Sequence, residues 1–197
     1  MEDMLAFIKS RRSTRRFASR PVEEEKLGAV LEAGRYAPSG GNNQSTHLLV
    51  ITDRAVMDQL ALLAEKLFSQ MEITPDTYKS LAGSIRTSKK GGYVFHYRAP
   101  VLILTANKAS YSNSIADCAC VLENMMLMAN ALDLGSCWIN QIKWLNEEEE
   151  MLAFLEKIGL KPDERVWGGL VLGYADTPDG LPEREPLEHR GNPVTRI

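Results

Sequence analysis

Short apolar runs alternate along the chain with stretches in which apolar residues recur every three or four positions. Four runs predict buried β-strands, at 47–52, 101–106, 135–139 and 167–174. Helical spacing predicts helices over 2–10, from 23 to about 37, from 54 to about 67, over 112–134 and from Asn146. Elements that alternate in this way favour an α/β or α+β sandwich, and 197 residues suit a single domain spanning 1–197.

The boundaries of these elements carry a few local signals. Asp53 precedes a helical pattern and is expected to cap it, whereas Gly135 has the position of a glycine that ends a helix. The segment 68–98 has weak periodicity, with glycines and three aromatic residues near its end, and we expect a lid or a connection there. The alternative is that its aromatic residues belong to the core. Residues 176–197, rich in proline and charge, are expected to form a C-terminal arm.

Composition narrows the class of protein. The chain has 44% hydrophobic and 25% charged residues and a net charge of -3, which predicts neither nucleic-acid binding nor attachment to an anionic membrane. The three cysteines have no zinc-binding spacing, so we expect no metal site and a reducing, cytoplasmic location. The N-terminus lacks the pattern of a signal peptide, and the longest apolar stretch is interrupted by polar residues, which argues against a membrane span.

Two motifs carry candidate chemistry. RRSTRRF, at 11–17, places four arginines and two hydroxyls directly after a predicted helix, a combination suited to a phosphate. Its alternative interpretation is a solvated basic turn. APSGGNNQ, at 37–44, combines glycines that allow close approach of the backbone with side chains that suit the edge of a heteroaromatic ring. Alone, such a stretch is also typical of an ordinary turn.

Two further stretches are less specific. LGSCWINQ, at 134–141, joins the end of a helix to a strand. The C-terminal tail carries Arg184, Arg190 and Arg196 among acidic residues. On its own, this stretch is also typical of a surface arm. Cys118 and Cys120 have core spacing in a helix, so they are expected to be small core residues rather than redox centres.

Taken together, RRSTRRF, APSGGNNQ, ADCACVLENMMLMANALDLGSCWI and GGLVLGYAD resemble, in this order, the FMN-dependent nitroreductase family. The resemblance implies an α+β fold, a three-layer sandwich with a mixed, mainly antiparallel sheet flanked by helices. It also implies a homodimer with exchanged C-terminal arms and two FMN molecules at the interface. Ser45 and Thr46 stand where the family commonly has proline and an aromatic residue, so packing near the flavin is expected to differ there.

The resemblance also implies which residues bind the cofactor. The phosphate and ribityl contacts are expected from Arg11, Arg12, Ser13 and Arg15, with either Arg184 or Arg190 as a later cation. A loop that reaches the flavin of the other subunit is expected from Pro38, Ser39, Gly40 and Asn42. Contacts at the ring are expected from Gln44, Ile139, Asn140 and Gln141. No catalytic side chain is assigned, although His47 and His96 are conceivable proton donors whose alternative roles are structural.

The activity that follows is an NAD(P)H oxidoreductase that reduces nitroaromatics, quinones or related electron-poor acceptors by ping-pong hydride transfer. FMN supplies the chemistry, and the protein supplies orientation and electrostatics. Three alternatives stay open: dehalogenation or flavin fragmentation on the same scaffold, an FMN storage or sensor protein, and an anion-binding module. The choice between NADH and NADPH and the physiological acceptor are not predicted.

Overall fold

A four-stranded antiparallel sheet forms the middle layer of the protein. The computed structural model describes residues 2–188 and 190–197. The strands lie in the order β1 (His47–Ile51), β2 (Val101–Lys108), β4 (Glu164–Gly173) and β3 (Gly135–Ile139). The one parallel pairing among the described residues is an isolated bridge between Ser13 and Ser136 at the β3 edge. The four strands themselves pair antiparallel, which confirms the mainly antiparallel sheet that the resemblance implies.

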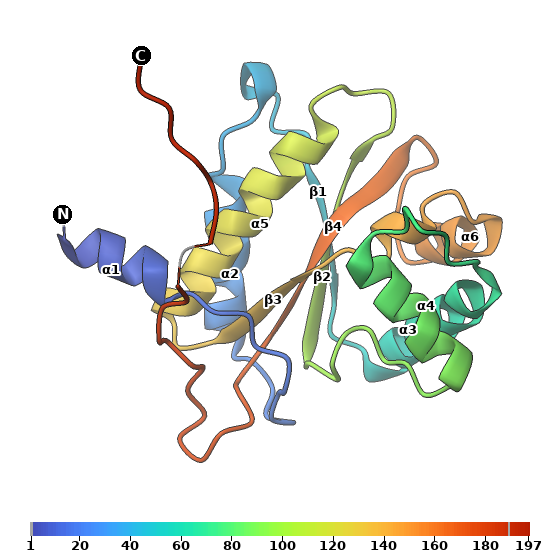
Figure 1. Ribbon diagram of the computed structural model, residues 1–197, viewed down its shortest axis with the longest axis horizontal. Helices are drawn as coiled ribbons and strands as arrows, with labels where there is room; N and C mark the ends of the chain where they lie inside the picture. The colour runs from blue at the N-terminus through green and yellow to red at the C-terminus, as the bar shows by residue number, and fades with distance from the viewer. Residues whose placement is uncertain (1, 189) are drawn as a thin grey trace.

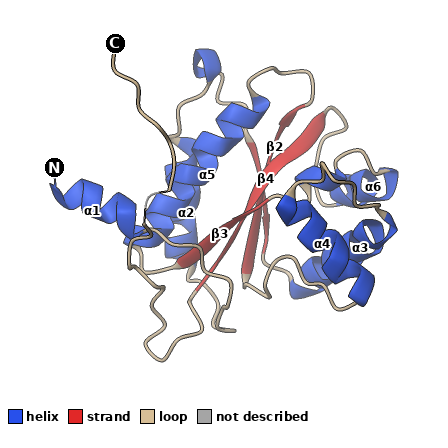
Figure 2. Ribbon diagram, in the orientation of Figure 1, coloured by secondary structure: helices blue, strands red, loops and turns tan. Residues whose placement is uncertain are grey.

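Helices cover both faces of this sheet (Figures 1 and 2). One layer contains α2 (Glu24–Arg35) and α5 (Ser114–Ala131), and the other contains α3 (Arg54–Gln70), α4 (Lys79–Lys90) and α6 (Glu149–Lys157). The helix α1 (Glu2–Ser10) and two short 3-10 turns, η1 (Gly40–Asn42) and η2 (Lys143–Leu145), complete the described elements. The expected three-layer α+β sandwich is confirmed.

Side-chain alternation along β2 explains why both faces are covered. Val101 and Ile103 belong to the core under α2 and α5, whereas Leu102 and Leu104 belong to the core under α3, α4 and α6. Because successive strand residues point to opposite faces, an unbroken apolar run gives two apolar surfaces that must each be covered.

The structure corrects the expectation of a lid or a connection over 68–98. This segment contains α4, which ends at Lys90 and is followed by Gly91 with a backbone φ of 85°, and Phe68 at its start is fully buried. Phe95 is also fully buried in the core, so for this residue the lid is wrong and the alternative, a place in the core, is confirmed. The helix is missed in the sequence because it has few apolar residues: two of its four buried positions are the serines Ser84 and Ser88.

Two boundary predictions are also wrong, and one is confirmed. Asn146 does not open the last helix; its buried amide bonds both backbone groups of Val166, and α6 begins at Glu149. Gly135 does not end α5; it begins β3, which confirms the strand predicted over 135–139, and a Cβ on it would lie 2.7 Å from Thr14 Oγ1. Asp53 does cap α3, since its Oδ1 accepts from the backbone N–H groups of Ala55 and Val56.

The C-terminal segment after β4 runs back past α1 and the end of α5 (Figure 1). The Arg184 guanidinium fastens it there, donating to the backbone oxygen of Asn130 at 2.8 Å and to Asp133 Oδ1 at 2.7 Å. Among the described helices, none is long and apolar enough to cross a membrane.

Candidate functional site

Residues 11–17, called here the arginine segment, lie along the open edge of β3. Thr14 N–H donates to the backbone oxygen of Ser136 at 2.9 Å, and Phe17 pairs with Ala175 just after β4. The close contact between Thr14 and Gly135 requires that Gly135 lack a side chain. Backbone pairing therefore fixes the direction of the arginine side chains.

A cavity of about 590 Å³ opens beside this segment. Its walls come from the end of α1, the arginine segment and the C-terminal segment: Ile8, Lys9, Arg11, Arg12, Ser13, Arg15, Pro186 and Leu187. Four of these side chains are cationic and none is a carboxylate. The cavity, named here the basic cavity, suits an anion such as a phosphate ester, which arginine binds through paired N–H donors.

The arginines of the basic cavity differ in their partners. Arg12 donates to the backbone oxygen of Glu185 and lies 3.3 Å from Glu183 Oε1, so it holds the C-terminal segment against the cavity. Among the described residues, Arg11 and Arg15 form no ion pair. These two guanidinium groups therefore retain their donors for a ligand.

A second cavity of about 280 Å³ adjoins the first, because Arg15 lines both. Aromatic and amide side chains dominate its walls: Tyr78, Ser80, Tyr97, Trp138, Ile139, Asn140, Gln141 and Trp144. Tyr78 and Trp144 meet edge to face, with ring centroids 6.2 Å apart. This aromatic cavity suits a planar ring system with polar edges.

Hydrogen bonds fix the end of β3 that enters the aromatic cavity. Gln141 Oε1 accepts from the backbone N–H of Asn140 at 3.1 Å, and Gln141 Nε2 donates to Tyr93 Oη at 3.0 Å. Burial raises the pKa of Tyr93, so its hydroxyl stays protonated and can bond to Ser84 Oγ at 2.8 Å. The chain from Ile139 to Gln141 is thus held in place before any ligand arrives.

Tyr97 enters the aromatic cavity from a strained stretch of backbone. Tyr97 and Arg98 have φ angles of 53° and 56°, a region that costs energy for residues other than glycine. Burial raises the pKa of Tyr97, and the nearby Arg15 guanidinium partly opposes this effect. The strained turn places a neutral phenol beside the cation that joins the two cavities.

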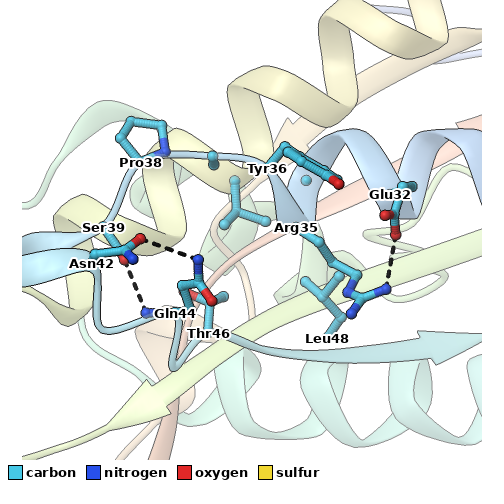
Figure 3. Close-up of a pocket in the computed structure, with 12 residues that line it drawn as sticks. Glu32, Arg35, Tyr36, Pro38, Ser39, Asn42, Gln44, Thr46 and Leu48 are labelled. Carbon is cyan, nitrogen blue, oxygen red and sulfur yellow. Dashed lines mark hydrogen bonds and ion pairs between the residues drawn. The ribbon is translucent and has the colours of Figure 1, made fainter.

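The loop that contains Pro38, Ser39, Asn42 and Gln44 lines a separate cavity of about 640 Å³ (Figure 3). Ser39 Oγ accepts from the backbone N–H of Gln44 at 2.9 Å, and Gln44 Nε2 donates to Asn42 Oδ1 at 3.1 Å. Asn42 and Gln44 have positive φ angles of 54° and 50°. The loop is therefore ordered by its own polar contacts while its side chains remain exposed.

The structure brings some of the expected site residues together and separates others. Through Arg15, the aromatic cavity with Ile139, Asn140 and Gln141 is joined to the basic cavity with Arg11, Arg12 and Ser13. The loop 38–44 lines neither of these two cavities. Arg184 is engaged at the end of α5, and the exposed Arg190 lies 4.0 Å from Glu188 Oε2, so neither lines the basic cavity.

Sequence reasoning did not assign Lys9, Tyr78, Trp138 and Trp144 to the site. Lys9 lies in the last turn of the helix just before the arginines, and Trp138 lies within the stretch 134–141 beside the residues that were assigned. Tyr78 and Trp144 belong to no motif, and only the fold brings them to a cavity wall. His47 and His96 line none of the three cavities. His47 Nδ1 lies 2.7 Å from Glu164 Oε2, and His96 is fully buried. Both histidines therefore fit the structural alternative and not the role of proton donor in a cavity.

Comparisons with known proteins identify one family. The sequence profile described as the nitroreductase family matches residues 8–174. A nitrobenzene nitroreductase of Ectopseudomonas oleovorans is 27% identical over 90% of this chain and 88% of its own. An Archaeoglobus fulgidus protein, named provisionally as an NADH dehydrogenase or NAD(P)H nitroreductase, is 28% identical over 88% of this chain and 86% of its own. A crystallised Bacteroides fragilis protein with bound FMN superposes with a TM-score of 0.85, at 30% identity over all of both chains.

Proposed function

Because this chain belongs to the nitroreductase family, we propose that it is an FMN-dependent oxidoreductase. It takes hydride from NADH or NADPH and passes it to nitroaromatics, quinones or related electron-poor acceptors. The observation that carries this proposal is the pair of adjoining cavities, one cationic and one aromatic, that share Arg15.

The residues present fit FMN at both of its ends. Arg11, Arg15 and Ser13 supply charged and hydroxyl donors for the phosphate, and the basic cavity has no carboxylate in its walls to oppose it. The aromatic cavity offers flat side chains and amide groups for the ring. Arg15, at the junction, would place positive charge next to the ring, where it stabilises negative charge.

FMN, when bound, would supply the hydride chemistry, which side chains alone cannot perform. The chain contributes orientation: the network of Tyr93, Gln141 and Asn140 fixes the backbone expected at the ring edge. Tyr78 and Trp144 present ring surfaces on which a planar nicotinamide or acceptor can stack. No side chain of this chain is assigned as acid or base.

We also propose that the enzyme is a homodimer in which the loop 38–44 serves the FMN of the other subunit. The loop is ordered yet separate from the basic and aromatic cavities of its own chain, which supports a role across an interface. Met4, Leu5 and Ile8 on α1 are 63%, 54% and 46% exposed, an apolar stripe that a second copy would cover. The C-terminal segment is held to its own subunit as far as Leu187, and the residues from 190 onward are proposed to cross to the partner. The free thiols of Cys118, Cys120 and Cys137 favour a cytoplasmic location.

The test is a visible spectrum of the purified protein followed by anaerobic titration with NADH and NADPH. We expect a yellow protein that either nucleotide bleaches and that a quinone or nitroaromatic restores. A yellow protein that neither nucleotide bleaches would favour the alternative of storage or sensing. A protein that stays colourless after incubation with FMN would contradict the proposal.

A further inference from the structure

The middle of the loop 38–44 is gripped on both sides by residues at the start of α5. The backbone N–H of Gly40 donates to Asp117 Oδ1 at 3.0 Å, and Tyr111 Oη donates to the backbone oxygen of Gly40 at 3.1 Å. Tyr111 lies in the turn before α5, and Asp117 lies in its first turn. We call Tyr111 and Asp117 the Gly40 clamp.

The Gly40 clamp is the connection between this loop and the remainder of the protein. Among the hydrogen bonds of the described residues, the two at Gly40 are those that join residues 38–44 to another element. The other bonds of the loop run within it or to Ser45. The position of the loop relative to the sheet therefore depends on Tyr111 and Asp117.

Gly40 packs closely against the residues that precede α5. A Cβ on Gly40 would lie 2.0 Å from Asn113 Nδ2 and 2.7 Å from Tyr111 Oη, so the backbone itself rests against the start of α5. Asp117 is 4% exposed, and its second oxygen, Oδ2, has no partner among the described residues. A single carboxylate oxygen of Asp117 thus accepts the hydrogen bond from Gly40, and the amide oxygen of an asparagine could replace it.

We propose that Tyr111 and Asp117 are positioning residues for FMN binding, acting through Gly40 on the loop 38–44 that serves the partner's site. This inference rests on the proposed function. Loss of either hydrogen bond would let Ser39, Asn42 and Gln44 move together, because these residues are bonded to one another. The clamp residues need touch neither FMN nor substrate.

The experiment measures the Kd for FMN of stripped protein together with its Tm. Asp117→Ala and Tyr111→Phe are each expected to weaken FMN binding by about tenfold, the scale of one hydrogen bond. Asp117→Asn, which keeps an acceptor for Gly40 N–H, should recover most of the affinity. The matched control is Ser114→Ala, since the hydroxyl of buried Ser114 donates to the backbone oxygen of Lys108 and, among the described residues, forms no hydrogen bond with the loop. It should lower the Tm and leave the Kd unchanged.

Mixed dimers separate positioning from general damage. Asp117→Ala subunits combined with Arg11→Ala/Arg15→Ala subunits should regain one tight FMN site per dimer, because one site then has an intact clamp and intact arginines. Mixed dimers without a tight site, an Asp117→Ala protein that binds FMN like the parent, or a Ser114→Ala protein that is equally impaired would each overturn the inference. The parent protein failing to bind FMN would instead overturn the proposed function, and this inference with it.

Discussion

The arginines between residues 11 and 16 differ in their partners, although the sequence presents them as one basic cluster. Arg11, Arg12 and Arg15 line the basic cavity, whereas Arg16 does not. Arg12 is engaged with the C-terminal segment. Individual substitutions can therefore distinguish ligand binding from simple loss of charge.

We expect Arg11→Ala and Arg15→Ala each to weaken FMN binding by about 1.5–3 kcal/mol, the scale of a hydrogen bond to a charged group. Riboflavin lacks the phosphate, so Arg11→Ala should leave its binding unchanged, and Arg15→Ala, which also lines the aromatic cavity, should weaken it less than it weakens FMN binding. Arg16→Ala, which removes the same charge outside the cavity, is the matched control. Fluorescence titrations with both flavins measure the four affinities. Equal losses for riboflavin and FMN would refute the phosphate assignment.

His96 makes the stability of the protein sensitive to acid. Burial, aided by the positive charge of Arg54, lowers the pKa of His96 from 6.5 to about 4, and neither ring nitrogen has a partner among the described residues. The unfolded chain takes up this proton near pH 6.5 and the folded chain does not. Stability is thus complete above pH 6.5 and falls as the pH drops toward 4, by about 3 kcal/mol at most.

Urea denaturation at several pH values measures this dependence. His96→Leu removes the titrating group while keeping an apolar side chain in the core, so its stability should vary less between pH 6.5 and 4. An equally steep loss in the parent protein and in the variant would place the acid sensitivity elsewhere.

At the scale of elements, the short segment between α4 and β2 contributes one residue to the core and a nearby residue to the aromatic cavity. Phe95 is fully buried, whereas Tyr97 is partly exposed and lines the cavity. Only His96 stands between these two residues in the sequence. Substitutions two positions apart should therefore have different consequences.

Phe95→Ala is expected to cost about 3–5 kcal/mol of stability, as for other buried phenylalanines, without changing the preference among acceptors. Tyr97→Ala should change kcat/KM differently for a quinone and a nitroaromatic, by about 1 kcal/mol for one lost aromatic contact. Tyr97→Phe, which keeps the ring, is the control. Thermal melts beside two-substrate kinetics decide between the roles. Altered selectivity in Phe95→Ala at unchanged stability would contradict them.

The sequence predicts the elements whose residues form a clear apolar pattern, and it misses those whose burial depends on contacts with distant residues. The strands at 101–106 and 167–174 are uninterrupted apolar runs, and both are found in β2 and β4. The helix α4 lacks such a pattern, since Ser84 and Ser88 occupy buried positions. The arginine segment could be assigned because its chemistry lies in consecutive residues. Tyr78 and Trp144 could not, because only tertiary packing brings them together.

At the scale of the whole molecule, the apolar stripe of Met4, Leu5 and Ile8 on α1 argues for a second copy. We expect sedimentation at low micromolar concentration to give a dimer of twice 22.0 kDa. Leu5→Lys should shift the equilibrium toward monomer, because a charge would then be buried in the interface. Asp3→Lys, an exposed change of charge on the same helix, is the control. A parent protein that holds FMN as a monomer would refute the dimer.

The pairing of the arginine segment with β3 and with the end of β4 has a consequence for biosynthesis. Thr14 bonds Ser136, and Phe17 pairs with Ala175, so contacts that shape the basic cavity close loops of more than a hundred residues. During translation the arginines emerge long before the strands that orient them. The nascent chain therefore cannot form the basic cavity until β4 is made, and binding of a ligand there has to follow the pairing of these distant segments.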